Sequence, residues 1–138
     1  LYNLSARDEK VAKAIAEAVR KIDKNLILFG LSGSFSISEA EKIGLKTASE
    51  VFADRTYQNN GSLTPRTQPN ALIESTEESI GQVLQMTKNK TVTATTGEEI
   101  PIAAETICIH GDGTHAVEFA RTINRRLQAE NIKIEAIV

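Results

Sequence analysis

The chain has 138 residues, of which 41% are apolar, a length and composition that predict one packed domain or part of one. Its 16 basic and 18 acidic residues give a formal net charge of −2, which argues against a basic nucleic-acid binder and against electrostatic attachment to a membrane surface. Its apolar runs are far shorter than the roughly 20 residues of a membrane-spanning helix, and its single cysteine, Cys108, excludes an internal disulfide framework, so we expect a reducing, cytoplasmic compartment.

Helical and strand-like patterns alternate along the first half of the chain. Residues 5–22 carry apolar side chains at helical spacing and predict a helix with Ser5 as its N-cap. The polar segment 54–70 contains Asn60-Gly61, which is typical of a hairpin turn. Between these two segments we expect a strand over 25–29, a turn of small residues, a helix over 38–44 and a strand over 45–52.

The second half continues the alternation. Ser75 and Glu78 form a capping box that marks the start of a helix, and Thr96-Gly97 predicts the turn of a small hairpin. The remaining expected elements are a strand over 106–109, a helix over 114–129 and a final strand over 132–138. This alternation predicts a parallel α/β sheet with right-handed crossovers. Four parallel strands cannot close a barrel, so the sheet is either a small open one or part of a larger unit.

Ligands of parallel α/β folds bind at the carboxyl ends of the strands. Ser32, Gly33 and Ser34 follow the first expected strand. Backbone N–H groups of such a turn, placed before a helix, can approach an anion. The alternative is a tight strand-to-helix turn that binds nothing.

Two further segments carry charge at strand ends. Glu50 lies within the second expected strand, where a carboxylate is costly to bury without a partner. It is either a functional residue or half of a buried ion pair with Arg55 or Arg66. Arg66 and Gln68 lie between two prolines, which stiffen the loop and favour contact of a held arginine with carboxylate or phosphate. A solvated surface turn is the alternative.

The last strand end carries an imidazole. His110 can act as a general acid, a general base or a metal ligand. Asp112, two residues on, can orient that imidazole or cap the next helix. With His115 these residues match a metal site in spacing, but two histidines and one nearby carboxylate make an incomplete ligand set. We expect His115 on a helix surface and Cys108 in the core.

Five segments, in this order and spacing, resemble the LamB/YcsF family, the A subunits of bacterial ATP-dependent 5-oxoprolinase. They are Leu-Tyr-Asn at 1–3, Gly-Leu-Ser-Gly-Ser at 30–34, Glu-Val-Phe-Ala-Asp-Arg-Thr-Tyr at 50–57, Arg-Thr-Gln-Pro at 66–69 and Ile-Cys-Ile-His-Gly-Asp at 107–112. The resemblance covers essentially the whole chain. Of the family's earlier motifs only the tail of Lys-Pro-His-Gly-Ala-Leu-Tyr-Asn is present, which implies that residues 1–138 are the C-terminal part of a single domain.

The resemblance implies part of a distorted parallel β/α barrel of the glycoside hydrolase/deacetylase type. It implies a hydrolase that opens the lactam of 5-oxoproline to L-glutamate with ATP as co-substrate and subunits B and C as partners. The expected catalytic residues are His110 and Asp112, with Glu50 and Asp54 tuning or positioning them. The residues expected to bind anionic groups of substrate or nucleotide are Ser32, Gly33, Ser34, Arg55, Arg66 and Gln68.

Two other functions stay open from the sequence. One is a metal-dependent, deacetylase-like hydrolase of carbohydrate or amide substrates, for which a divalent metal would bind at His110. The other is a non-catalytic scaffold that mainly docks subunits B and C. The family usually has other residues at His115, which supports an incidental role for that side chain.

Overall fold

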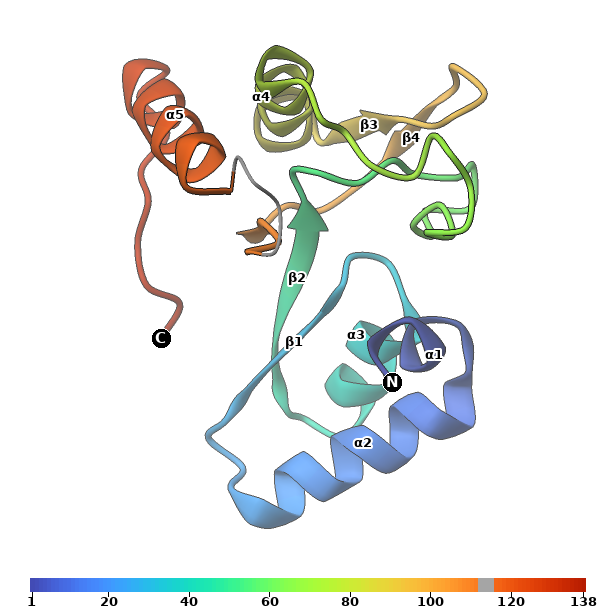
Figure 1. Cartoon of the computed structure of the whole chain (residues 1–138). Helices are drawn as coiled ribbons and strands as arrows, with labels where there is room; N and C mark the ends of the chain where they lie inside the picture. Colours follow the sequence, from blue (N-terminus) through green and yellow to red (C-terminus); the bar gives the residue numbers. More distant parts are fainter. Residues whose placement is uncertain (112–115) are drawn as a thin grey trace.

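The computed structural model describes residues 1–111 and 116–138. Its main sheet has three parallel strands in the order β1-β2-β5, formed by β1 (Ile27–Leu31), β2 (Lys46–Phe52) and β5 (Thr106–Cys108) (Figure 1). All pairs are parallel, so the three carboxyl ends lie at the same end of the sheet. The predicted parallel α/β class is therefore confirmed.

Three helices pack together beside β1 and β2 (Figure 1): α1 (Tyr2–Arg7), α2 (Glu9–Ile22) and α3 (Phe35–Lys42). The prediction of one helix capped by Ser5 is wrong. Asp8 has an extended conformation, with φ −122° and ψ 108°, and its carboxylate accepts the N–H groups of Lys10 and Val11 at 3.0 and 3.1 Å. Asp8 therefore ends α1 and caps α2.

The helix after β1 begins at Phe35 rather than near residue 38. A glycine in β1 permits its close packing, because a Cβ on Gly30 would lie 2.9 Å from Ser36 Cβ and 3.1 Å from Ile37 Cδ1. The helix stops before Gly44, whose φ of +73° suits glycine. The expected stop signal is confirmed, while the start was placed too late.

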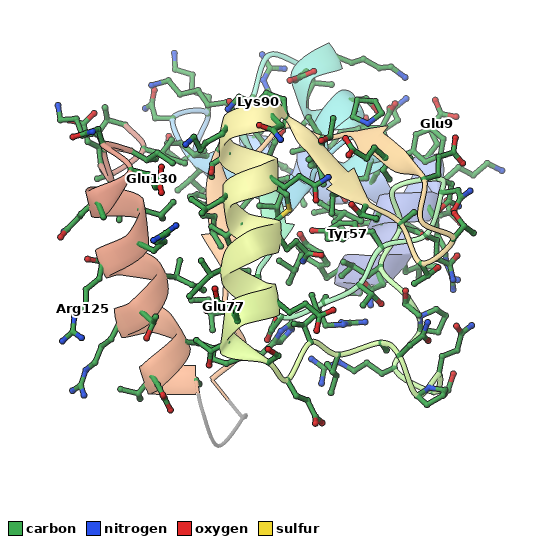
Figure 2. All side chains as sticks on the ribbon, turned by 90° about the horizontal axis from the view of Figure 1, so that it is seen from above. Glu9, Tyr57, Glu77, Lys90, Arg125 and Glu130 are labelled. Atoms are coloured by element: carbon green, nitrogen blue, oxygen red, sulfur yellow. The ribbon has the colours of Figure 1, made fainter. Side chains whose placement is uncertain are left out.

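The second half of the chain covers the carboxyl end of the sheet. Helix α4 (Thr76–Leu84) continues into the π-helical turn η1 (Gln85–Asn89), and α5 (Ala116–Ala129) packs beside α4 (Figure 2). The hairpin of β3 (Thr91–Thr93) and β4 (Glu99–Pro101) turns at 96–97 as predicted. The predicted helix start at Ser75 is also confirmed, since its Oγ accepts the Glu78 N–H at 3.4 Å, which is the Ser75 half of the predicted capping box.

The expected final strand over 132–138 is wrong. This segment has the alternating apolar pattern of a strand, but the structure assigns it no strand and leaves most of it exposed. A strand requires a partner for its backbone groups, and within the described residues β5 pairs only with β2. The segment runs instead as an unpaired tail from the end of α5 (Figure 1).

The main core lies at the carboxyl end of the sheet, where strand residues meet α4, the hairpin and α5. Its buried members include Leu31, Val51, Phe52, Tyr57, Val83, Met86, Val92, Ile100, Phe119, Ile123 and Leu127. Close packing there gives the neighbouring strand ends a rigid support. None of the described helices is long and apolar enough to cross a membrane.

Candidate functional site

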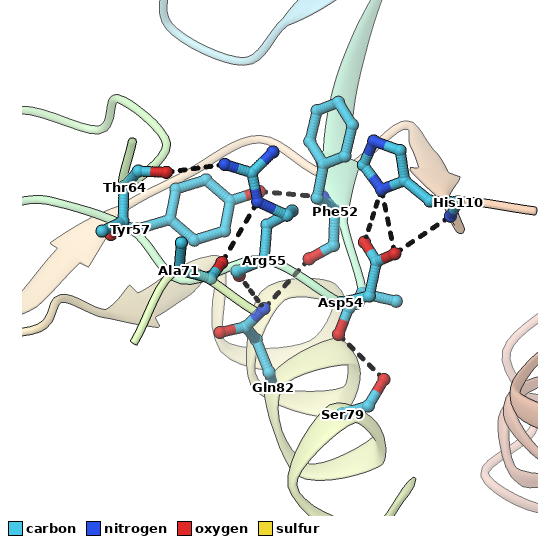
Figure 3. A network of polar contacts seen from close by, with 10 residues as sticks. Phe52, Asp54, Arg55, Tyr57, Thr64, Ala71, Ser79, Gln82 and His110 are labelled. Carbon is cyan, nitrogen blue, oxygen red and sulfur yellow. Dashed lines mark hydrogen bonds and ion pairs between the residues drawn. The ribbon is translucent and has the colours of Figure 1, made fainter. Parts of the chain in front are cut away.

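An aspartate and a histidine meet where β2 and β5 end. His110 Nδ1 lies 3.0 Å from Asp54 Oδ1 and 2.9 Å from Oδ2, and the His110 N–H donates to Oδ2 at 3.0 Å (Figure 3). An ionised carboxylate only accepts hydrogen bonds, so Nδ1 carries the proton of the neutral imidazole. The other nitrogen, Nε2, is then the lone-pair nitrogen, which is the one able to accept a proton from a ligand.

The backbone around this aspartate is fixed by α4. Gln82 Nε2 donates to the carbonyls of Phe52 and Arg55, both at 2.9 Å, and Ser79 Oγ donates to the carbonyl of Ala53 at 2.8 Å (Figure 3). Buried polar groups that find such partners hold one conformation. Helix α4 thereby fixes the segment that carries the carboxylate.

An aromatic ring stacks on the imidazole. The Phe52 ring stacks on His110, with centroids 5.5 Å apart and an interplanar angle of 24°, and Tyr2 meets Phe52 edge-on at 5.8 Å. The Tyr2 hydroxyl is buried beside the Glu50 carboxylate. Burial, and then the nearby Glu50 carboxylate, raise the pKa of Tyr2 far above its ordinary value. Its hydroxyl therefore stays protonated at neutral pH.

Sequence reasoning assigned no role to Tyr2 or Phe52. Both residues lie within the segments that carry the family resemblance, and this was the only signal that marked them. Glu50 is half-buried on β2 and forms no ion pair within the described part of the chain. Arg55, one of the partners considered for it, donates instead to backbone carbonyls.

The neighbouring thiol is not set up as a nucleophile. Cys108 ends β5 and packs against the main core. Burial, followed by the charges of Glu50 and Asp54, raises the pKa of Cys108 to about 11. Because the thiolate is the reactive form, this residue reacts slowly near neutral pH.

Most of the predicted anion-binding residues line a second place, a pocket of about 850 Å³ beside α1. Ser32, Gly33, Ser34, Arg55 and Arg66 all line it. Sequence reasoning missed a third arginine on its wall, Arg7 of α1. We call this the arginine pocket, defined by the three arginines and the turn at 32–34.

Four of the described residues of the predicted site are not placed in the arginine pocket. The lining does not include Gln68, which is exposed, and it does not include Glu50, Asp54 or His110. The expected anion-binding and catalytic groups thus lie at the same end of the sheet but in two separate places. Asp54 belongs to the place where His110 lies, whereas Arg55, the next residue in the sequence, belongs to the arginine pocket.

Two sequence candidates, Asp112 and His115, lie outside the described residues 1–111 and 116–138, so their roles stay predictions. Within those ranges, no group of three or more His, Cys, Asp or Glu side chains could hold a metal ion. Asp54 and His110 provide two side chains of the kinds that bind metal ions.

The chain matches the LamB/YcsF family over residues 1–138. The 5-oxoprolinase A subunit of Bacillus subtilis (strain 168) is 52% identical over 137 residues, 99% of this chain and 53% of that protein. The protein of the same name from Staphylococcus carnosus (strain TM300) is 56% identical over 134 residues, 97% of this chain and 53% of that protein. The crystal structure of a lactam utilization protein from Thermus thermophilus has a TM-score of 0.88 and 35% identity, covering 99% of this chain and 54% of that one. The chain spans about half the length of these relatives.

Proposed function

Because this chain belongs to the LamB/YcsF family, we propose that it is part of an ATP-dependent 5-oxoprolinase that opens the lactam of 5-oxoproline to L-glutamate. Relatives named as A subunits of 5-oxoprolinase, and a structural neighbour named for lactam utilization, support this substrate class. The word subunit in those names supports assembly with other chains, which we propose to be subunits B and C.

The contact between His110 and Asp54 carries the proposal. A lactam is an unreactive amide, and its hydrolysis needs water to lose a proton and the ring nitrogen to gain one. With Nδ1 held by Asp54 at 2.9 and 3.0 Å, Nε2 of His110 can accept the first proton and donate the second. Water adds to the ring carbon, the carbon–nitrogen bond breaks, and the products are a carboxylate and an amine.

ATP lowers the remaining barrier in this proposal. Transfer of its γ-phosphoryl group to the lactam oxygen leaves ADP and makes the ring carbon a better electrophile. Attack by one water molecule and cleavage of the carbon–nitrogen bond then leave an acyl phosphate and a free amine. A second water molecule hydrolyses the acyl phosphate to the carboxylate of glutamate and inorganic phosphate. The residues proposed to hold the anionic groups of substrate or nucleotide are Ser32, Gly33, Ser34, Arg55 and Arg66, all of which line the arginine pocket, together with the exposed Gln68.

The metal-dependent hydrolase has no observation in its favour within the described residues. Catalytic zinc sites use three protein ligands, whereas Asp54 and His110 are two. A scaffold that only docks other subunits would not require the contact between the Asp54 carboxylate and the His110 imidazole at the end of the sheet.

The test is glutamate formation from 5-oxoproline by the protein that contains this chain, assayed together with subunits B and C. We expect formation to require ATP and to release one phosphate for each glutamate. Turnover of an amide without ATP but with a divalent metal would contradict the proposal in favour of a metal-dependent hydrolase. Full activity of the complex with His110→Ala would indicate a scaffold.

A further inference from the structure

The charged side chains in the described lining of the arginine pocket are all arginines. Arg7, Arg55 and Arg66 line it, and none of the described residues on its wall is Asp or Glu. The whole chain, by contrast, has more acidic than basic residues, 18 against 16. A concave wall with charge of one sign concentrates ligands of the opposite sign. The pocket is therefore suited to an anion.

Arg55 is built into this wall. The residue is 3% exposed, and its Nε and Nη2 donate to the carbonyls of Ala71 and Thr64 at 3.1 and 2.6 Å (Figure 3). These neutral acceptors orient the guanidinium without neutralising it. Burial, and then the positive charge of Arg66, lower the pKa of Arg55, although Asp54 acts in the opposite direction. An anion bound beside two neighbouring cations relieves their repulsion.

The turn before α3 adds two serines to the same wall. Ser34 is the N-cap residue of α3, but its side chain makes no capping hydrogen bond. Its Oγ is buried and has no partner in the part of the chain that the structure describes. Ser32 Oγ accepts the Ala103 N–H at 3.0 Å, so its own O–H can still donate. Both serines line the pocket at the positive end of a helix.

We propose that the arginine pocket binds a phosphate group, held by the fixed Arg55 together with Arg7 and Arg66, which line the same pocket. This inference deepens the proposed function, on which it rests for the identity of the ligand. Charge favours phosphate over carboxylate, because one bidentate arginine satisfies a carboxylate, whereas several guanidinium groups match a dianion. The volume of about 850 Å³ leaves room for a ligand larger than the phosphate alone.

The phosphate has two chemical sources within the proposed reaction. One is a nucleotide, and the other is the phosphorylated form of a small acid or amide. Both present the same dianionic group to the arginines. They differ in what lies beyond it, so competing ligands can separate them.

Calorimetric titration of the whole protein that contains this chain with inorganic phosphate and pyrophosphate, at constant ionic strength, tests the proposal. We expect both to bind, and acetate to bind at least tenfold more weakly than phosphate. Arg66→Gln and Arg7→Gln should each weaken phosphate binding tenfold or more. Arg121→Gln is the matched control, because Arg121 is exposed on α5 and outside the pocket lining. Of ATP and acetyl phosphate, the tighter competitor identifies the source of the phosphate.

Equal phosphate affinity in Arg66→Gln and Arg121→Gln, with both folded by circular dichroism, would overturn the proposal. Equal binding of acetate and phosphate would also overturn it, in favour of a carboxylate site. The titration requires no turnover, so the two proposals can fail separately. If the enzyme forms glutamate but its arginine pocket binds no phosphate, only the proposal that this pocket binds phosphate is contradicted. If the pocket binds phosphate but the enzyme does not turn over 5-oxoproline, only the proposed 5-oxoprolinase function is contradicted.

Discussion

Asp54 determines which nitrogen of His110 can take part in proton transfer. Its carboxylate accepts both the Nδ1 proton and the backbone N–H of that residue, while the Phe52 ring lies stacked on the imidazole. The ring is thus fixed in position and orientation. The side chain of His110 is still 28% exposed, so a ligand can reach it.

We expect His110→Ala to lower 5-oxoproline turnover about 10²-fold or more, the usual scale for the loss of an acid–base group. The measurement is ATP-dependent glutamate formation by the assembled enzyme. His115→Ala is the matched control, because it removes the other imidazole of the same short segment, and it should change turnover little. Equal losses in the two variants, with both folded by circular dichroism, would contradict an acid–base role for His110.

Cys108 gives a prediction of pH dependence. Its pKa is raised to about 11 from a reference of 9.0, so the thiolate forms only as the pH approaches 11. Near pH 8 we expect iodoacetamide to alkylate the folded chain about 10²-fold more slowly than the urea-unfolded chain, since each pKa unit changes the thiolate fraction tenfold. Mass spectrometry of quenched samples measures both rates, and equal rates would contradict the shift.

The raised pKa of Cys108 also makes the stability of the folded chain depend on pH. Folding raises this pKa, so the unfolded chain releases the thiol proton first as the pH increases. The contribution of Cys108 to the free energy of unfolding is therefore complete below about pH 9 and declines toward about pH 11. Cys108→Ser should reduce the stability loss in that pH range, as measured by urea unfolding.

At the scale of elements, the packing of α3 on β1 depends on one glycine. A Cβ at Gly30 would lie 2.9 Å from Ser36 Cβ, whereas one at Gly81 of α4 would meet nothing within 4 Å. We expect Gly30→Ala to destabilise the chain by about 1–3 kcal/mol through overpacking. Gly81→Ala should stabilise it by about 0.5–1 kcal/mol through helix propensity. Urea unfolding of both variants tests the pair, and equal effects would contradict it.

The sequence predicted the elements better than their boundaries. Local signals were sufficient at Ser75, Gly44 and Gly97, because a cap or a left-handed turn depends on one or two residues. They failed at Asp8, where a longer apolar stripe concealed a cap between two helices. They also failed for the tail at 132–138, because strand formation depends on a distant partner and not only on the alternating pattern.

The candidate site, too, could be predicted from the sequence only in part. The alternation of strands and helices predicted a parallel sheet. Asp54 and His110 were therefore expected at the same end of it, since both follow parallel strands. Their direct contact could not be predicted, because it depends on how α4 fixes the backbone after β2. Arg7 was missed because nothing in the sequence of α1 shows that this helix lies against the turn at 32–34.

At the scale of the whole molecule, the sheet leaves apolar surface exposed. Phe29 in β1 is 46% exposed, and Leu26, Ile134 and Val138 are also largely exposed. Such surface favours association in water. We expect the 138-residue chain alone to self-associate or to unfold at low temperature, as measured by analytical ultracentrifugation and thermal melting. A single monomeric species with a cooperative melt at high temperature would contradict this expectation.

Asp54 holds the imidazole at one site, and Arg55, the next residue, forms part of the wall at the other. Consecutive Cα atoms across a trans peptide are about 3.8 Å apart. One backbone position of each site is therefore kept at this spacing by covalent geometry and not by the packing of helices. A rearrangement of α2, α4 or α5 could tilt or cover either site, but it could not separate these two backbone positions.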